Sequence, residues 1–312
     1  MTIQRKHLAW LMPKCREEYK AVLCSDGGAG DWAWATMAHY GINHSVKSLA
    51  GWLATFDHET GGGTILFESL TYTSTDRLKA VWPSRFVFEK KYRKEIAEYN
   101  QKLKDAGYND AQRPALIQKG FAAYKEKHEA WVASLLRNEK KLAGAVYAGR
   151  MGNRDEEDAF NFRGTYWHQF TGRSGALGVA KKIGVDLDAR PELFRDMKIN
   201  FIMTCVEWKE SGCNELCNKG NFKAAFAAIN VGGTSPEAIA ATVDMPGREQ
   251  RLSRALQLVG QDPSAYSLNK ATLVEIDANK DGINDVVAQL YGNPVQTAAS
   301  SSLHWTECTE VA

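Results

Sequence analysis

The chain has 312 residues, of which 44 % are hydrophobic, and its 39 basic and 37 acidic residues give a formal net charge of +2. A charge so close to balance gives no reason to expect a nucleic-acid partner. No apolar run approaches the roughly 20 residues that a membrane-spanning helix needs, and the apolar stretch near the N-terminus is too short for a signal peptide and ends at Pro13. We therefore expect a soluble protein, made in the cytoplasm without a cleavable signal peptide.

The first predicted element that carries chemistry is a helix that ends at Glu59. Ser45 suits its N-cap, the glycines at 61–63 stop it, and apolar residues recur at helical spacing at Leu49, Leu53 and Phe56. Glu59 shares the face of Phe56, so we expect its carboxyl group to be desolvated and protonated, as a general acid must be. The alternative is an ordinary exposed glutamate at a helix end.

A second glutamate, Glu68, follows nine residues later, after the short run 64–67, which suggests a small β element. Cleavage of a glycosidic bond needs one carboxyl group to protonate the leaving oxygen and another to activate water or attack the sugar. The spacing of Glu59 and Glu68 suits that chemistry.

Residues 87–140 differ in composition, because they mix lysine and glutamate runs with alanines. This pattern predicts two long helices that break near 107–114, within an insertion. The insertion is either a wall-docking arm or partner-binding surface, or a solvated helical hairpin packed on the catalytic lobe.

Residues 141–262 return to apolar helical patterns. The spacing of the cysteines fits no zinc site. A disulfide such as Cys15 with Cys24 is one alternative to free thiols.

Six segments, taken together and in order, resemble the phage endolysins and bacterial muramidase effectors related to the family 19 chitinases. They are 38–43, 53–62, 82–86, 146–153, 162–173 and 228–233. The resemblance implies a mainly α, two-lobed, lysozyme-like fold with a small β element by the cleft. It also implies cleavage of the glycan strands of bacterial peptidoglycan.

In that family the first glutamate is the general acid and the second is the general base, with inversion at the anomeric carbon. The resemblance therefore implies that Glu59 is the acid and Glu68 the base, and that Thr171 belongs to the catalytic group. The residues it assigns to substrate binding are Arg163, Tyr166, Gln169 and Asn230. Tyr166 and the neighbouring Trp167 are candidates for stacking on sugars, with a buried core role as the alternative.

Two departures from the family pattern concern the bound sugar. Thr165 and Tyr166 stand where the family usually continues an Arg-Gly-Arg-Gly segment, and Val231 interrupts its Asn-Gly-Gly segment. The alternatives are consequently a chitinase, because the same resemblance covers both, or a non-catalytic wall-binding protein on the same fold.

The C-terminal residues suggest a second chemistry. Oxygen ligands from Asp277, Asn279, Asp281 and Asp285, the carbonyl of Ile283, and a glycine at position 6 match an EF-hand-like calcium loop. Ala288 stands at position 12, where a glutamate would supply the last ligand, so an Asx-rich turn without an ion is the alternative.

We therefore predict a catalytic domain over 1–262 and a tail over 263–312 that binds Ca²⁺. The enzyme would act at the cell wall or in the periplasm after release or secretion, as a phage lysis enzyme or an antibacterial effector. Its partners would be peptidoglycan strands and, for an effector, a cognate immunity protein or a delivery component. No cofactor is needed for this catalysis.

Overall fold

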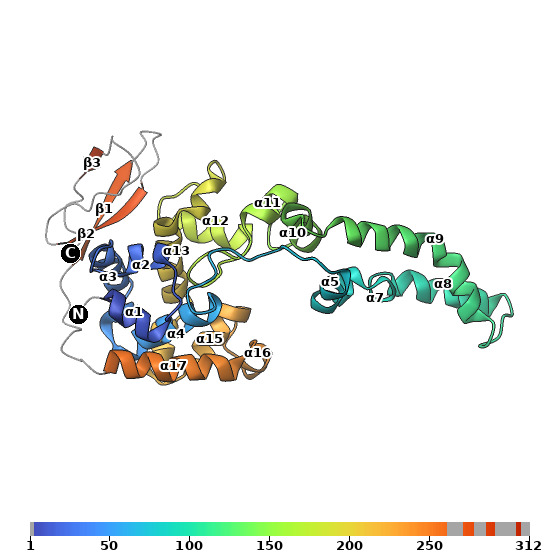
Figure 1. Cartoon of the computed structure of the whole chain (residues 1–312), viewed down its shortest axis with the longest axis horizontal. Coiled ribbons are helices and arrows are strands. Elements are labelled where there is room, and N and C mark those ends of the chain that lie inside the picture. Colours follow the sequence, from blue (N-terminus) through green and yellow to red (C-terminus); the bar gives the residue numbers. More distant parts are fainter. Residues whose placement is uncertain (1–2, 261–270, 278–284, 291–303, 307–312) are drawn as a thin grey trace. The chain divides into compact units, whose positions relative to one another are not determined.

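The computed structural model describes residues 3–260, 271–277, 285–290 and 304–306, and it is mainly helical (Figure 1). The chain divides into two compact units. The first unit comprises residues 1–68 together with the chain from 161 onward, and the second unit comprises residues 69–160. Among the described helices, none combines the length and the apolar character needed to cross a bilayer.

The first unit contains helices from both ends of the chain. Its N-terminal helices are α1 (Arg5–Leu11), α2 (Glu17–Leu23), α3 (Gly30–His39), η1 (Ile42–His44) and α4 (Val46–Glu59). The later helices are α12 (Arg173–Lys182), η2 (Pro191–Arg195), α13 (Met197–Glu210), α14 (Cys213–Asn218), α15 (Phe222–Val231), α16 (Pro236–Ala241) and α17 (Met245–Gly260). Helix α17 packs along α4, which lies at the centre of the unit.

Helix α4 begins and ends as its sequence predicts. The Ser45 side chain caps it by accepting a hydrogen bond from the Ser48 amide at 3.0 Å. The chain leaves the helix after Glu59 through three glycines, 61–63, with φ between +56° and +76°, a left-handed conformation that glycine adopts without a side-chain clash. These two features fix the end of the helix, and so they fix the position of Glu59.

An aromatic core holds α4 in place. Trp52 and Phe56 from α4 pack against Trp167 with ring centroids 6.1 and 5.1 Å apart, and Phe201 of α13 lies 4.9 Å from Trp167. All four rings are fully buried. Such aromatic contacts add to the stabilisation that comes from burying the rings. The end of α4 is therefore packed on a buried aromatic cluster.

The second unit is built from shorter helices and one long pair. Its helices are α5 (Thr75–Val81), α6 (Pro83–Phe86), α7 (Phe88–Lys91), α8 (Arg93–Asp105), α9 (Arg113–Ser134), α10 (Glu139–Tyr147) and α11 (Glu156–Asn161), the last of which ends at the first residue of the other unit. A small core of buried residues, which includes Leu78, Phe86, Val132, Leu142 and Val146, holds it together.

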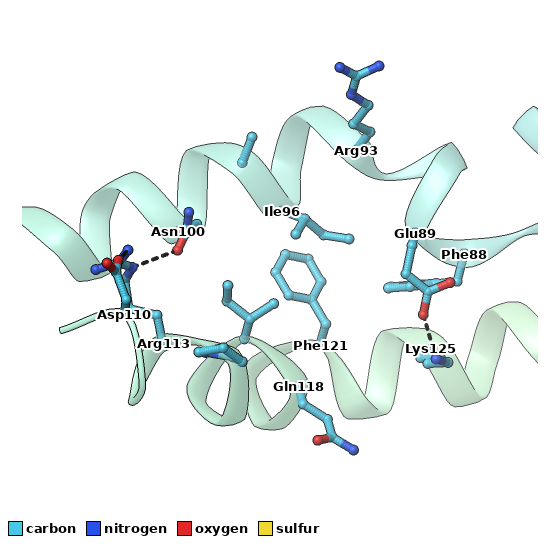
Figure 2. A pocket seen from close by; sticks show the side chains of 13 residues that line it. Phe88, Glu89, Arg93, Ile96, Asn100, Asp110, Arg113, Gln118, Phe121 and Lys125 are labelled. Atoms are coloured by element: carbon cyan, nitrogen blue, oxygen red, sulfur yellow. Dashed lines mark hydrogen bonds and ion pairs between the residues drawn. The ribbon is translucent and has the colours of Figure 1, made fainter. Parts of the chain in front are cut away.

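The predicted pair of long helices is present as α8 and α9, and the chain turns between them at Gly107, whose φ is +87°. A hollow of about 710 Å³ lies between these helices. Figure 2 shows Ile96 and Phe121 pointing into the space between them. Two of its charged groups have polar partners: Lys125 bonds Glu89, and Arg113 Nε donates to Asn100 at 3.0 Å. The hollow is thus an apolar groove between helices that are bridged at both ends.

The predicted insertion, 87–140, lies within the second unit. The compact unit begins at Ser69 and ends at Phe160, so it includes the segments 82–86 and 146–153 that the sequence had assigned to the catalytic lobe. The reason is packing, because Phe86 and Val146 belong to the same small core as Val132 of α9.

The C-terminal region forms three strands in the part that is described. They are β1 (Ala271–Asp277), β2 (Asp285–Leu290) and β3 (His304–Thr306), in the antiparallel order β2-β1-β3. Because β1 pairs with β2 from Ile276 opposite Asp285, the segment between them connects two strands. An EF-hand loop instead connects two helices.

Candidate active site

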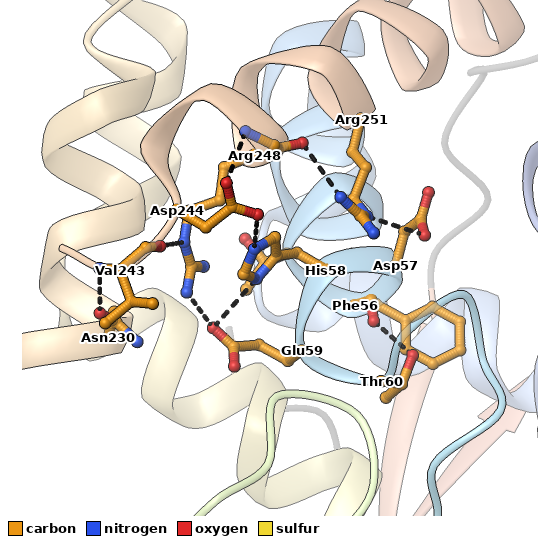
Figure 3. A network of polar contacts seen from close by, with 12 residues as sticks. Phe56, Asp57, His58, Glu59, Thr60, Asn230, Val243, Asp244, Arg248 and Arg251 are labelled. Atoms are coloured by element: carbon orange, nitrogen blue, oxygen red, sulfur yellow. Dashed lines mark hydrogen bonds and ion pairs between the residues drawn. The ribbon is translucent and has the colours of Figure 1, made fainter. Parts of the chain in front are cut away.

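Glu59, the predicted acid, ends α4 with its carboxylate in an ion pair. Arg248 of α17 donates from Nη2 to Glu59 Oε1 at 2.6 Å (Figure 3). The Arg248 side chain is only 1 % exposed and that of Glu59 is 16 % exposed, so the pair is shielded from water. His58 Nδ1 lies 3.9 Å from the same carboxylate oxygen. Charged partners, and not apolar surroundings alone, define this position.

The predicted apolar setting of Glu59 is therefore corrected. Trp52 and Phe56 are buried in the aromatic core, whereas the Glu59 carboxylate turns to Arg248. Position on a helical face predicted the neighbours along α4 correctly, but α17 supplies the group that contacts the carboxylate. A contact that spans 189 positions in the sequence cannot be read from the spacing within one helix.

Arg248 also connects the acid to Asn230, one of the predicted substrate-binding residues. Arg248 Nε donates to the Val243 carbonyl at 3.0 Å, and the Val243 amide donates to Asn230 Oδ1 at 3.1 Å (Figure 3). Asp244, the next residue, lies 3.1 Å from His58 Nε2. Asn230 thus lies two hydrogen-bonded steps from the ion pair, at the end of α15.

Sequence reasoning missed Arg248, although a signal was present. The buried residues of α17 are Arg248, Leu252, Ala255 and Val259, which recur at helical spacing. A basic residue on the apolar face of an amphipathic helix needs a buried partner, because an unpaired buried charge is costly. That rule predicts an acidic partner for Arg248 without naming it.

Glu207 of α13 is a further carboxyl group near Glu59 that the sequence did not reveal. Burial and the negative charge of Glu59 raise the pKa of Glu207 to about 8. Glu207 is therefore protonated at neutral pH. Its signal in the sequence is a single acidic residue within the otherwise apolar run from Phe201 to Trp208.

Glu68, the predicted base, is held by the segment that carries most of the predicted substrate-binding residues. Its amide donates to the Gly164 carbonyl at 2.7 Å, and Arg163 Nε donates to the Glu68 carbonyl at 3.2 Å. Isolated β-bridges pair Phe67 with Thr165 and Thr165 with Phe170. These bridges are all that the described residues form where the short strand 64–67 was expected.

Gly164 is the residue around which the predicted site residues meet. A Cβ placed on it would lie 3.2 Å from Glu68 Cβ, 2.9 Å from Gln169 Oε1 and 3.5 Å from Thr171 Oγ1. The side chains of Glu68, Gln169 and Thr171 therefore lie around Gly164. A larger side chain at this position would displace at least one of them.

The loop that carries Gln169 and Thr171 is strained and internally bonded. Tyr166 and Gln169 both adopt left-handed φ values, 49° and 52°, which are uncommon for residues other than glycine. Gln169 Nε2 donates to the Tyr166 carbonyl at 3.0 Å, and the Thr171 hydroxyl donates to the Gln169 carbonyl at 2.7 Å. Strain that surrounding bonds maintain is typical of functional loops.

Tyr166 and Trp167 do not serve as exposed stacking surfaces, which corrects that prediction. Tyr166 is 7 % exposed and its hydroxyl donates to the Arg195 carbonyl at 2.8 Å, while Trp167 is fully buried in the core. The alternative that the sequence left open, a core role for both rings, holds in the first unit.

The described residues contain no group of three or more His, Cys, Asp or Glu side chains that could hold a metal ion. Within the predicted calcium loop, Asp277 ends β1 and Asp285 begins β2, and Asn279, Asp281 and Ile283 lie outside the described residues. The described cysteines are buried free thiols, so the disulfide considered between Cys15 and Cys24 is absent. Burial raises the pKa of each of these two thiols to about 12.

Comparison with known proteins adds no family assignment. The sequence matches no protein-family model, and a search of curated proteins returns no significant match. The site is accordingly defined by its own geometry. The ion pair of Glu59 with Arg248 lies at the end of α4, and Glu68, Gln169 and Thr171 lie around Gly164, all within the first unit.

Proposed function

We propose that this chain is a glycoside hydrolase with a lysozyme-like fold related to the family 19 chitinases, and that it cleaves the glycan strands of bacterial peptidoglycan. The observation that carries the proposal is the meeting of Glu68, Gln169 and Thr171 around Gly164, in the same compact unit as Glu59. Two carboxyl groups and a water-binding hydroxyl are the parts that an inverting glycosidase needs.

In this proposal Glu68 is the general base and Thr171 positions the water. The Thr171 hydroxyl donates its one hydrogen bond to the Gln169 carbonyl. Its oxygen therefore remains able to accept a hydrogen bond from water. Such a water can give its other proton to the Glu68 carboxylate as it attacks the anomeric carbon. Gln169 then serves to orient the Thr171 hydroxyl, and Arg163 to fix the backbone of Glu68.

Glu59 is the general acid, with Arg248 as its positioning residue and Glu207 as a neighbouring carboxyl group. The buried guanidinium group fixes the Glu59 carboxyl in one orientation. Because the pKa of Glu207 is raised to about 8 by burial and by Glu59, a proton is held next to Glu59 across the neutral range.

The biological setting we propose is lysis of the cell wall. The enzyme acts on the wall after release or secretion, either as a phage lysis enzyme or as an antibacterial effector, and an effector would be matched by an immunity protein. Calcium binding by the C-terminal loop belongs to the same proposal, and catalysis does not depend on it.

Digestion of purified peptidoglycan sacculi tests the reaction. The wild-type chain should release soluble fragments with new reducing ends on the amino sugars, whereas Glu59→Gln and Glu68→Gln should each lower the rate by about 10²–10⁴, the usual contribution of a general acid or base. Glu18→Gln, in an exposed carboxylate on α2, is the matched control and should digest normally. Near-normal lysis by Glu59→Gln would contradict the proposal.

The same experiment separates this substrate from the alternative one. Mass analysis of the products identifies the cleaved linkage, and chitin oligomers are digested in parallel. Soluble chitin fragments without release from sacculi would assign the chain to the chitinases.

A further inference from the structure

The second unit contains a small hollow that is lined by cations. Its walls are formed by Ser84, Arg85, Lys91, Trp131 and Ala145, and its volume is about 320 Å³. Lys91 Nζ lies 4.1 Å from the centroid of the Trp131 ring, and Arg85 Nη1 donates to the Ala145 carbonyl at 3.1 Å. The hollow therefore combines two positive charges with an aromatic floor.

A third cation, Arg150, adds to the positive charge at this place. Arg150 Nη1 donates to the Val146 carbonyl at 3.3 Å, which holds the side chain over the end of α10. Burial and the nearby Arg150 lower the pKa of Arg85, and burial and the nearby Arg85 lower the pKa of Lys91. The three side chains are thus close enough to repel one another.

No acidic residue relieves this repulsion in the part of the chain that the structure describes, because Arg85, Lys91 and Arg150 form no ion pair there. In the larger hollow between α8 and α9, by contrast, Lys125 is paired with Glu89 and Arg113 with Asp110. Like charges that are gathered without a counter-charge are a cost to the fold, and an anion from outside would remove that cost.

The floor of the hollow is rigid. The Trp131 ring packs against Phe86 with ring centroids 5.7 Å apart and against His128 at 5.4 Å, and both of these residues are buried. A side chain fixed in this way offers a preformed surface for an apolar group, and binding there costs little ordering. Ligand sites commonly join such an apolar surface to a few charged groups.

We infer that this hollow is a subsite for a carboxylate on the peptide stems of the substrate polymer. The inference rests on the proposed function and names a feature of the substrate that the catalytic residues do not specify. Lys91 and Arg85 would donate charge-assisted hydrogen bonds to the carboxylate, and Trp131 would contact the adjoining aliphatic part of the stem. Chitin carries no carboxylate, so this subsite would favour peptidoglycan over chitin.

The segments that form the subsite were singled out by their sequence. Arg85 belongs to 82–86 and Arg150 to 146–153, and the hydrogen bond from Arg85 to Ala145 ties the first of these segments to α10, just before the second. Both segments lie in the second unit, and the two glutamates lie in the first. Substrate selection by charge and bond cleavage are therefore assigned to different units.

Binding can be measured apart from turnover in the full-length Glu59→Gln chain. The probes are an N-acetylmuramyl dipeptide with a free carboxylate, the same compound with that carboxylate converted to an amide, and inorganic phosphate, each titrated by calorimetry. We expect the acid to bind more tightly than the amide. Lys91→Gln and Arg150→Gln should each weaken binding of the acid by about fivefold, as loss of an exposed or partly exposed charge pair does.

The matched control is Lys127→Gln, which removes one charge from an exposed position on α9 outside the hollow and should bind like the parent. Arg85→Gln should have a larger effect, and its melting temperature separates loss of binding from loss of the bond to Ala145. Higher salt should weaken binding of the acid and leave the amide unaffected.

Equal binding of acid and amide, or equal affinity in Lys91→Gln and Lys127→Gln, would overturn the inference. Binding of phosphate alone would overturn the assignment to a carboxylate. The two proposals fail differently. Sacculi that the wild-type chain digests while acid and amide bind alike contradict only the subsite, whereas intact sacculi contradict the hydrolase whatever the titrations give.

Discussion

The first unit takes several charged groups out of water around one site, whereas the second unit carries most of its charge on exposed helices. Arg248, Asp57 and Arg163 are all less than 9 % exposed in the first unit, and two of them contact Glu59 or Glu68. The second unit has 18 basic and 13 acidic residues, a net charge of +5, while the rest of the chain has 21 and 24, a net charge of −3.

This difference shows how a chain with almost no net charge can still present a charged surface. Buried charges must be paired within the fold, so they can orient groups in a site but cannot attract a distant polymer. Exposed cations contribute little to stability and are available to a polyanion. The four predictions that follow test this division, beginning with the largest expected effect.

Arg248→Met should be the most damaging of these changes. It leaves the shielded Glu59 carboxylate without its guanidinium partner, and breaking a buried ion pair in this way costs about 3–5 kcal/mol. Lys125→Met is the counterpart in the second unit, where both members of the pair with Glu89 are exposed, and it should cost less than about 1 kcal/mol. Denaturant unfolding measures both.

A second substitution makes the test of Arg248 specific. In the double variant Glu59→Gln with Arg248→Met, no charge is left unpaired, so part of the lost stability should return. If the double variant is as unstable as Arg248→Met, the cost comes from lost packing and not from the charge on Glu59.

Glu207→Gln should change how stability depends on pH. The folded chain holds the Glu207 proton with a pKa raised to about 8, whereas an unperturbed glutamate titrates near 4.5. The folded state therefore binds the extra proton between these values, and stability falls as pH rises through this window, by at most about 1.4 kcal/mol per pH unit. The variant should remove that slope in unfolding curves recorded at several pH values.

Glu89, in the second unit, makes stability depend on pH in the opposite direction. Its hydrogen bond to Lys125 lowers the pKa of this carboxyl group below 4.5, so its contribution is present above that value and is lost as pH falls. Glu89→Gln should leave the slope between about pH 4.5 and 8 unchanged. If both variants changed the slope of stability against pH equally, the slope between about pH 4.5 and 8 would not be due to Glu207.

Gly51→Ala in the first unit, set against Gly120→Ala in the second, compares how much stability each unit loses when a methyl group is added. A Cβ on Gly51 would meet Cys217 Sγ at 2.6 Å and the Trp208 ring at 3.4 Å, both buried, and overpacking of this kind costs about 1–3 kcal/mol. In the second unit, a Cβ on Gly120 would meet the Tyr99 ring at 3.0 Å, but this ring is only half-buried and can move.

We therefore expect Gly120→Ala to stay within about 0.5 kcal/mol of the wild type, because the better helix propensity of alanine offsets the adjustment. Adding Cys217→Ala to Gly51→Ala should restore part of the lost stability. Thermal unfolding checks the series, and an unrelieved loss in that double variant would mean that the Trp208 ring, not the thiol, sets the limit.

Calcium should have the smallest effect. If the C-terminal loop binds the ion, a calcium concentration ten times the dissociation constant stabilises the folded state by about 1.4 kcal/mol. Asp277→Ala or Asp281→Ala should abolish the response. A melting temperature that is insensitive to calcium and to chelator would make the loop an ordinary turn.

Local features of the fold were predictable from sequence. The N-cap at Ser45, the end of α4 at Glu59 and the turn at Gly107 depend on residues within a few positions of one another, and the structure confirms each of them. Short-range rules of capping and glycine conformation are sufficient for such features.

The features of the fold and the site that the sequence did not reveal depend on contacts between residues that are distant in sequence. Arg248 meets Glu59 across 189 positions, and Gly164 meets Glu68 across nearly a hundred, so neither spacing nor composition reveals them. The burial of Tyr166 and Trp167 likewise depends on Tyr19 and Phe201, which belong to other elements. The core of the second unit likewise joins segments on both sides of the long helices.

The hydrogen bond between the Glu68 amide and the Gly164 carbonyl has a consequence for the history of this chain. Glu68 is the last residue before the second unit, and the chain re-enters the first unit at Asn161, three residues from Gly164. The point where the chain leaves the first unit and the point where it re-enters are therefore held within about 10 Å of each other, the reach of three extended residues. A gene could lose, lengthen or exchange everything between these two points while the first unit keeps its ends in register. The junction is thus a point at which the second unit could be exchanged while the first unit keeps its own contacts.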